Sequence, residues 1–178
     1  MIHVQNYING TFRNSINNNC INNLNPATGD LIATIPKSDL NDIDLAVNAA
    51  KKAFPLWSNL TINERANWLK KIANELEKRF DEVAKLESKD TGKPITLAKN
   101  VDATRSVSNF RFFANLIEEL ENPEFGMDDA MNTIIRKPAG IAGLITPWNL
   151  PLYLLSWKVA PALVMGNCVI AKPSELTP

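Results

Sequence analysis

The sequence predicts an α/β fold that contains one parallel βαβ unit. Two short apolar runs, Ile141 to Ile145 and Cys168 to Ala171, have the length and composition of buried strands. Between them, Leu150 to Met165 is long and apolar enough for a crossover helix, and Gly166-Asn167 supplies its stop signal. A strand, a helix and a second strand in this order are expected to form a parallel, right-handed unit.

The amino-terminal residues predict a hairpin, a loop and a strand. Asn9-Gly10 lies between Tyr7-Ile8 and Thr11-Phe12, which is a strong signal for a two-residue hairpin turn. The Asn-rich stretch from Asn14 to Asn25 has no periodicity and is interpreted as a polar loop. A turn over Asn25 to Asp30 then leads into a strand from Leu31 to Ile35, which Pro36 is expected to stop.

Helices are predicted for most of the middle of the chain. Ser38 or Asp39 can cap a first helix, which Pro55 is expected to end. Thr61 and Glu64 have the spacing of a capping box for a second helix. The apolar stripe predicted for this second helix consists of Ile62, Ala66, Leu69, Ile72 or Ala73, Leu76 and Phe80.

Two further helices and a strand complete the prediction. A short helix from Asp81 to Asp90 is followed by Gly92, a typical carboxyl-terminal stop. A longer helix is expected from Ile95 to Leu120, ended by Asn122 to Gly126, and Met131 to Arg136 is predicted as a strand. The residues expected on one side of the longer helix are Ala98, Val101, Ser108, Phe112, Leu116 and Leu120.

The composition gives no support to several classes of partner. Of the 178 residues, 45% are hydrophobic, which suffices for a buried core. Lys+Arg and Asp+Glu number 19 each, so no net charge attracts nucleic acid or an anionic membrane. No apolar run reaches the roughly 18 residues that a membrane-spanning helix needs. The amino terminus does not resemble a secretion signal, so a cytoplasmic location is expected.

Cysteine and histidine patterns do not predict a catalytic or metal centre. Cys20 and Cys168 have neither metal-ligand nor redox spacing, so we expect no metal and a reducing compartment. His3 is the only histidine and lies at the amino terminus, which argues against histidine-based catalysis.

Two polar clusters follow the two strands of the βαβ unit. Thr146-Pro147-Trp148-Asn149 follows the first strand, and Lys172-Pro173-Ser174-Glu175 follows the second. Ligands of open parallel sheets bind at the carboxyl ends of the strands, so both clusters are expected to face one crevice. The sequence contains neither a GxGxxG pattern nor a Walker-type loop, which are the usual phosphate-binding signatures.

Asn149 and Trp148 each have two interpretations. The Asn149 amide is a neutral hydrogen-bond donor, suited to an oxyanion that forms during attack on a carbonyl group. Alternatively, Asn149 is the amino-terminal cap of the following helix. Trp148 either forms the wall of a pocket or packs against its own βαβ unit.

The charged residues of the unit have both functional and structural interpretations. Lys172 donates and Glu175 accepts hydrogen bonds, so the pair suits the diol of a ribose. The alternative is a solvated turn with a weak surface ion pair. Lys158 lies in an otherwise apolar helix, where it either extends to solvent or pairs with a polar group.

The joint pattern resembles the aldehyde dehydrogenase superfamily. The matching motifs include NPATG at 25–29, DTGKP at 90–94, TPWN at 146–149 and AKPSELTP at 171–178. The resemblance covers essentially all 178 residues. NFRFF at 109–113 and the form TPWNLPLYLLSWK are most similar to the enzymes that oxidise 2-hydroxymuconate and 2-aminomuconate semialdehydes.

The resemblance implies a partial Rossmann-like nucleotide-binding domain of the aldehyde dehydrogenase fold, with amino-terminal helices and an oligomerisation strand. Residues 1–128 would hold the amino-terminal hairpin and the helical part of this domain. Residues 129–140 would be the oligomerisation segment, as in family members that form homodimers and homotetramers. Residues 141–178 would be the first βαβ unit.

The resemblance also implies NAD-dependent oxidation of a small aldehyde, of the muconate-semialdehyde type, to the carboxylic acid. Asn149 would be the oxyanion donor. Lys172 and Glu175 would hold the adenosine ribose, with the Glu175 charge favouring NAD over its 2′-phosphorylated form. The cofactor-binding residues implied are Thr146, Pro147, Trp148, Asn149, Lys172, Ser174 and Glu175.

The family mechanism requires two further groups. A cysteine forms a thiohemiacetal with the aldehyde, and a glutamate activates the hydrolytic water. Both belong to motifs downstream of AKPSE, and neither Cys20 nor Cys168 fits the context of the nucleophile. We therefore expect these 178 residues to act as part of a longer enzyme and to be inactive alone. The alternative is a noncatalytic assembly or nucleotide-binding module that works with a separate chain.

Overall fold

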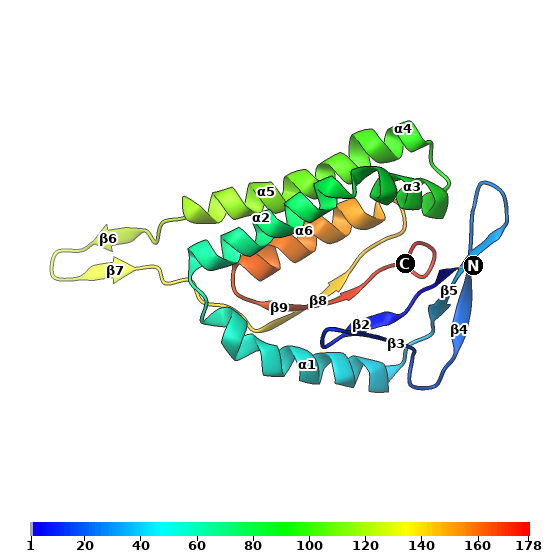
Figure 1. The fold of residues 1–178 in the computed structure, drawn as a ribbon. Coiled ribbons are helices and arrows are strands. Elements are labelled where there is room, and N and C mark those ends of the chain that lie inside the picture. The colour runs from blue at the N-terminus through cyan, green and yellow to red at the C-terminus, as the bar shows by residue number, and fades with distance from the viewer. Residues whose placement is uncertain (1) are drawn as a thin grey trace.

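The computed structural model describes residues 2–178 and arranges most of them in layers (Figure 1). One layer consists of three packed helices, α2 (Ile62–Lys78), α5 (Thr104–Glu118) and α6 (Pro151–Val164). Next to α6 lie β8 (Ile141–Ile145) and β9 (Cys168–Lys172), which pair in parallel. The predicted βαβ unit is thereby confirmed, with boundaries within a residue of those expected.

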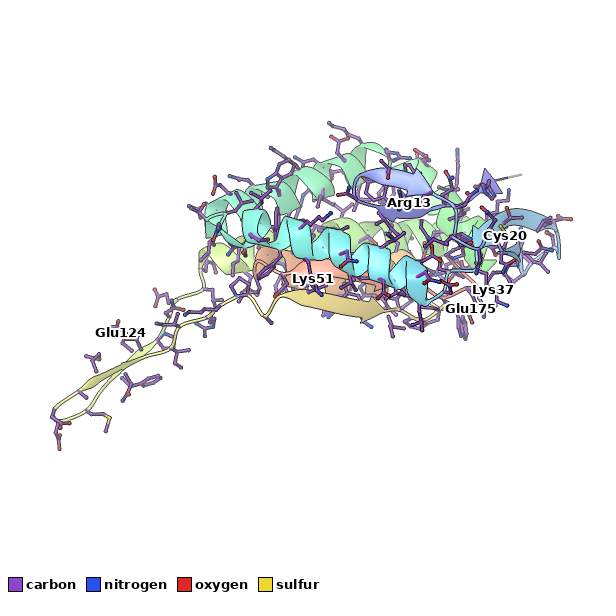
Figure 2. The ribbon with its side chains drawn as sticks, turned by 90° about the horizontal axis from the view of Figure 1, so that it is seen from below. Arg13, Cys20, Lys37, Lys51, Glu124 and Glu175 are labelled. Carbon is purple, nitrogen blue, oxygen red and sulfur yellow. The ribbon has the colours of Figure 1, made fainter. Side chains whose placement is uncertain are left out.

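Helix α1 (Leu40–Ser58) packs against the strand pair and runs along it when the molecule is seen from below (Figure 2). Asp39 is its amino-terminal cap and accepts a hydrogen bond from the Asn41 amide at 2.8 Å. The expectation that Pro55 ends this helix was wrong. Pro55 is exposed, and the helix continues for another turn in which the Trp57 indole donates to a carbonyl oxygen of α6.

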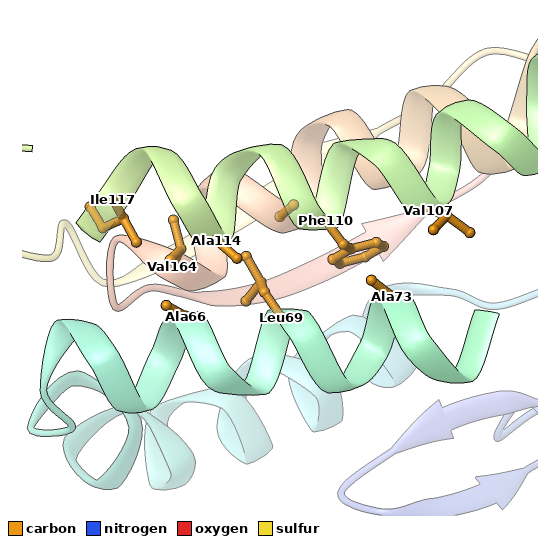
Figure 3. Close-up of a cluster of buried hydrophobic side chains, with 9 residues drawn as sticks. Ala66, Leu69, Ala73, Val107, Phe110, Ala114, Ile117 and Val164 are labelled. Atoms are coloured by element: carbon orange, nitrogen blue, oxygen red, sulfur yellow. The ribbon is translucent and has the colours of Figure 1, made fainter. Parts of the chain in front are cut away.

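The hydrophobic core lies between α2, α5 and α6 (Figure 3). Leu69 of α2 and Phe110 of α5 are its largest well-buried side chains, and alanines on all three helices let the backbones approach closely. The buried residues of this core are Ala66, Leu69, Ala73, Val107, Phe110, Ala114, Ile117, Ala160 and Val164.

The capping and stop signals of the middle helices are confirmed. The Thr61 amide donates to Glu64 Oε2 at 2.8 Å, and the Glu64 amide donates to Thr61 Oγ1 at 3.2 Å. Such a capping box typically stabilises a helix by about 1 kcal/mol. Helix α3 (Phe80–Thr91) ends at Gly92, which adopts a left-handed φ of 72°. The apolar stripe predicted for α2 was wrong at its first position, because Ile62 is 42% exposed.

The long helix predicted from Ile95 contains a π-helical segment, η1 (Ala98–Ala103), between the short α4 (Ile95–Leu97) and α5. A π-helical turn holds more residues than an α-helical turn, so it rotates the face that follows. The predicted stripe is therefore wrong beyond η1, where Phe112 is 56% and Leu116 is 44% exposed. The buried α5 residues are Ser106, Val107, Asn109, Phe110, Ala114 and Ile117.

The amino-terminal hairpin is confirmed as β2 (Asn6–Ile8) and β3 (Thr11–Arg13). Asn9 and Gly10 have φ values of 55° and 74°, as a type I′ turn requires.

A second sheet joins β1 (Ile2–His3), β5 (Leu31–Pro36) and β4 (Cys20–Leu24). The loop predicted over Asn14 to Asn25 was therefore wrong for its last part, which pairs antiparallel with β5. Long-range contacts order this polar strand, since buried Asn23 donates to Asp90 Oδ1 at 2.6 Å.

A narrow hairpin of β6 (Glu124–Gly126) and β7 (Met131–Thr133) projects from the rest of the molecule (Figures 1 and 2). The strand predicted from Met131 to Arg136 is confirmed only as far as Thr133. Arg136 instead donates to the Glu121 carbonyl oxygen at 2.7 Å, which ties the base of the hairpin together.

Candidate nucleotide and carbonyl site

The two predicted polar clusters lie at adjoining ends of β8 and β9. Ile145 and Lys172 are paired in register, and the Thr146 amide donates to the Lys172 carbonyl oxygen at 3.2 Å. Further along, Thr177 Oγ1 donates to the Trp148 carbonyl oxygen at 3.3 Å. The loop after β8 and the loop after β9 therefore touch each other, as expected for the carboxyl ends of two neighbouring parallel strands.

Helix α6 is fixed at its carboxyl end by side chains from other elements. Arg65 is 8% exposed, and its Nε donates to the Val164 carbonyl oxygen at 2.8 Å. Trp57 Nε1 donates to the Leu163 carbonyl oxygen at 3.0 Å. These donors satisfy carbonyl groups that a helix end leaves without partners. Lys158 donates to the Ile145 carbonyl oxygen, so of its two interpretations the structure favours the polar pairing.

The Asn149 side chain is exposed and has no hydrogen-bond partner among residues 2–178. Its helix-cap interpretation is not supported, because α6 begins at Pro151 and Leu150 occupies the cap position without a side-chain hydrogen bond. The Asn149 backbone carbonyl, in contrast, accepts a hydrogen bond from Lys93 Nζ at 3.2 Å. The backbone of this residue is held while its side-chain amide is available to a ligand.

Lys172 and Glu175 form an exposed ion pair with an Nζ–Oε2 distance of 3.1 Å. Lys172 Nζ also donates to the Pro173 carbonyl oxygen at 3.0 Å. The Glu175 backbone amide and the Lys172 ammonium lower the pKa of the Glu175 carboxyl, so this group is a carboxylate at neutral pH. Both side chains are more than half exposed, which leaves a donor and an acceptor side by side for a diol.

The remaining residues of the two clusters differ in accessibility. Trp148 is 59% exposed and Pro147 is also exposed. Thr146 is buried, and its hydroxyl has no hydrogen-bond partner among residues 2–178. Ser174 is 8% exposed, and its hydroxyl accepts a hydrogen bond from the Leu176 amide at 3.2 Å. The Ser174 side chain therefore stabilises the turn that presents its neighbours.

Neither cysteine lies at this site. Cys168 begins β9, about 13 Å of strand away from Lys172 at the other end. Burial raises the pKa of the Cys168 thiol, which disfavours the thiolate form. Cys20 is exposed on β4. Within residues 2–178, no group of His, Cys, Asp and Glu side chains could hold a metal ion, and no helix could cross a membrane.

A buried charged cluster behind the Asn149 loop was not predicted from the sequence. Lys93 Nζ lies 2.9 Å from Asp102 Oδ1 and 4.0 Å from Glu87 Oε1. Burial and the nearby Asp102 carboxylate raise the pKa of Glu87 to about 7, although Lys93 opposes this shift. Lys, Asp and Glu are common on protein surfaces, so residue type alone does not indicate a buried cluster. The available signal in the sequence was the position of Lys93 within the DTGKP motif.

The family model that matches the chain is the aldehyde dehydrogenase family, over residues 12–178. The 2-aminomuconic semialdehyde dehydrogenase of Mus musculus is 47% identical over 99% of the chain and 36% of the relative. The 2-hydroxymuconic semialdehyde dehydrogenase of Pseudomonas sp. (strain CF600) is 40% identical, over 100% of the chain and 38% of the relative. The chain thus spans little more than a third of the length of these relatives.

Solved structures are also similar to nearly the whole chain. PnpE in complex with nicotinamide adenine dinucleotide has a TM-score of 0.94 and 41% identity, covering 98% of the chain and 36% of PnpE. A putative aldehyde dehydrogenase from Burkholderia cenocepacia has a TM-score of 0.94 and 39% identity, covering 100% of the chain and 37% of that structure. The predicted α/β class, with a partial Rossmann-like domain, is confirmed by these likenesses.

Proposed function

Because the chain belongs to the aldehyde dehydrogenase family, we propose that it is the part of an NAD-dependent aldehyde dehydrogenase that holds the adenosine ribose and polarises the aldehyde carbonyl. The observation that carries this proposal is the exposed, unpartnered Asn149 amide, on a loop that touches the loop of the Lys172–Glu175 pair. A donor for an oxyanion and a donor–acceptor pair for a diol thus lie on adjoining loops.

NAD would accept a hydride from the substrate. The residues of this chain that suit it are Lys172, as donor, and Glu175, as an ionised acceptor, both exposed at the end of β9. A carboxylate at this position repels a 2′-phosphate, so NAD is the form of the cofactor that we propose. The complex of PnpE with nicotinamide adenine dinucleotide supports the assignment.

The proposed reaction begins with attack of a thiolate on the aldehyde carbon. A C–S bond forms, the π bond of the carbonyl group breaks, and negative charge is placed on the carbonyl oxygen. The Asn149 amide would donate a hydrogen bond to that oxygen and stabilise the charge. Cys20 and Cys168 lie away from the two loops, so neither would supply the thiol. In this proposal the nucleophile comes from a segment other than residues 2–178.

We further propose a muconate-type semialdehyde as the substrate, on the basis of the two semialdehyde dehydrogenases described above. The complete enzyme that carries these residues is expected to form NADH when it receives 2-aminomuconate or 2-hydroxymuconate semialdehyde and NAD. The test is the steady-state rate of NADH formation. It is compared with the rate of NADPH formation when NADP replaces NAD, and with the rate of NADH formation from simple aliphatic aldehydes. NADH from aliphatic aldehydes alone would contradict the substrate class. Absence of NADH from every aldehyde would favour the noncatalytic assembly module.

We also propose that the projecting β6–β7 hairpin contacts another copy of the chain, which accounts for the apolar residues that it exposes. Light scattering on the complete enzyme is expected to give the mass of two or four chains, and the mass of one chain would contradict this role. The large exposed apolar residues on the hairpin and its following segment are Phe125, Met127, Met131, Ile134 and Ile135.

A further inference from the structure

Three ionisable side chains are buried together behind the Asn149 loop. Glu87 lies on α3, Lys93 follows this helix and Asp102 lies in the π-helical segment η1. Their side chains are 8%, 11% and 0% exposed, respectively. Removing charges from water costs several kcal/mol for each ion unless pairing compensates for the loss. Core packing alone would not require charged residues at these positions.

The cluster contacts the backbone of the turn that carries Asn149. Lys93 Nζ donates to the Asn149 carbonyl oxygen at 3.2 Å. Helix α6 begins two residues later, at Pro151. One buried cation therefore holds the peptide of Asn149 just before this helix starts.

Lys93 is itself held by an ion pair within the cluster. Lys93 lies 2.9 Å from Asp102 Oδ1, and the π-helical segment presents Asp102 to the interior. Asp102 Oδ2 and Glu87 Oε1 have no hydrogen-bond partner among residues 2–178.

We propose that Lys93, anchored by Asp102 and Glu87, is a positioning residue that fixes the backbone of Asn149 and so directs the Asn149 amide at the reacting carbonyl. This inference rests on the proposed function, because the role of Asn149 is assigned there. The Asn149 amide has no side-chain partner of its own among residues 2–178, so the direction in which it points depends on how its peptide is held.

Replacing Lys93 with Met in the complete enzyme tests the proposal. We expect kcat to fall roughly 10- to 100-fold, because small displacements of a catalytic group have effects of this size. The Kd for NAD should stay unchanged, because Lys172 and Glu175 are not disturbed. Lys99→Met is the matched control, since Lys99 pairs with Asp81 at the surface at 2.6 Å. This control should retain the kcat of the wild type.

A double-mutant cycle separates positioning from a general effect on the fold. When Asn149 is already Ala, Lys93→Met should lower kcat little further, because the group that it positions is gone. An equal loss in both backgrounds would overturn the positioning role. If Lys93→Met alone does not fold, Lys93→Met with Asp102→Asn removes both charges of the pair and is measured in the same two backgrounds.

The outcomes also distinguish this inference from the proposed function. A wild-type kcat in the Lys93→Met variant, beside a low kcat in Asn149→Ala, would overturn the positioning role and leave the role of Asn149 intact. A wild-type kcat in Asn149→Ala would overturn the oxyanion role itself, and the inference with it.

Discussion

The Asn149→Ala variant of the complete enzyme is expected to lose roughly 10²- to 10³-fold in kcat, the usual cost of removing one oxyanion donor. The Kd for NAD should change little. The physical reason is that the Asn149 amide has no hydrogen-bond partner among residues 2–178, so its removal breaks no hydrogen bond of the described fold. What is lost is a hydrogen bond to charge that develops only during the reaction.

Two further variants make the Asn149 prediction specific. Asn149→Asp keeps the shape of the side chain but replaces the donor with a carboxylate, so its kcat should be as low as that of Asn149→Ala. Asn48→Ala removes an exposed amide from α1 and should behave like the wild type. Steady-state kinetics and thermal unfolding of all four proteins provide the check. A wild-type kcat in Asn149→Asp would contradict the oxyanion role.

The βαβ unit could be predicted from the sequence because its signals are local. The strands are short apolar runs, and Gly166-Asn167 ends the helix between them. The same holds for the Asn9-Gly10 hairpin and for the capping box at Thr61, where a few neighbouring residues determine the backbone.

The errors arose where distant contacts override local preference. Residues 20–24 form a strand because they pair antiparallel with β5, although their Asn-rich sequence favours a loop. Helix α1 continues past Pro55, and its last turn is tied to α6 through Trp57. The π-helical segment η1 rotated the buried face of α5, and no periodicity in the sequence indicated this change.

At the candidate site, too, the local signals were predicted from the sequence and the distant contacts were not. Asn149, Lys172 and Glu175 follow predicted strands, so topology alone placed their two loops together. Lys93 was not predicted as part of the site, since 56 positions separate it from the Asn149 carbonyl that it contacts. Arg65 was also not predicted, because its buried contact with Val164 spans 99 positions. Contacts of this kind become visible only when the helices are packed.

The central claim is that the Lys172–Glu175 pair at the end of β9 holds the ribose of NAD. Calorimetric titration of NAD into the complete enzyme tests it, with Lys172→Met and Glu175→Gln as the variants. Hydrogen bonds to charged groups contribute about 1.5–3 kcal/mol, so each variant should lose roughly 10- to 100-fold in NAD affinity. Glu175→Gln should also reduce the preference for NAD over NADP, because the repulsive carboxylate is gone.

A second exposed ion pair provides the matched control for this titration. Lys70 and Glu118 lie 2.7 Å apart on α2 and α5, away from both loops, so Lys70→Met and Glu118→Gln should bind NAD like the wild type. The predicted result is a loss of NAD affinity in the Lys172 and Glu175 variants and none in the controls. Wild-type NAD affinity in both Lys172→Met and Glu175→Gln would contradict the claim. It would favour the alternative interpretation, a solvated turn with a weak surface ion pair.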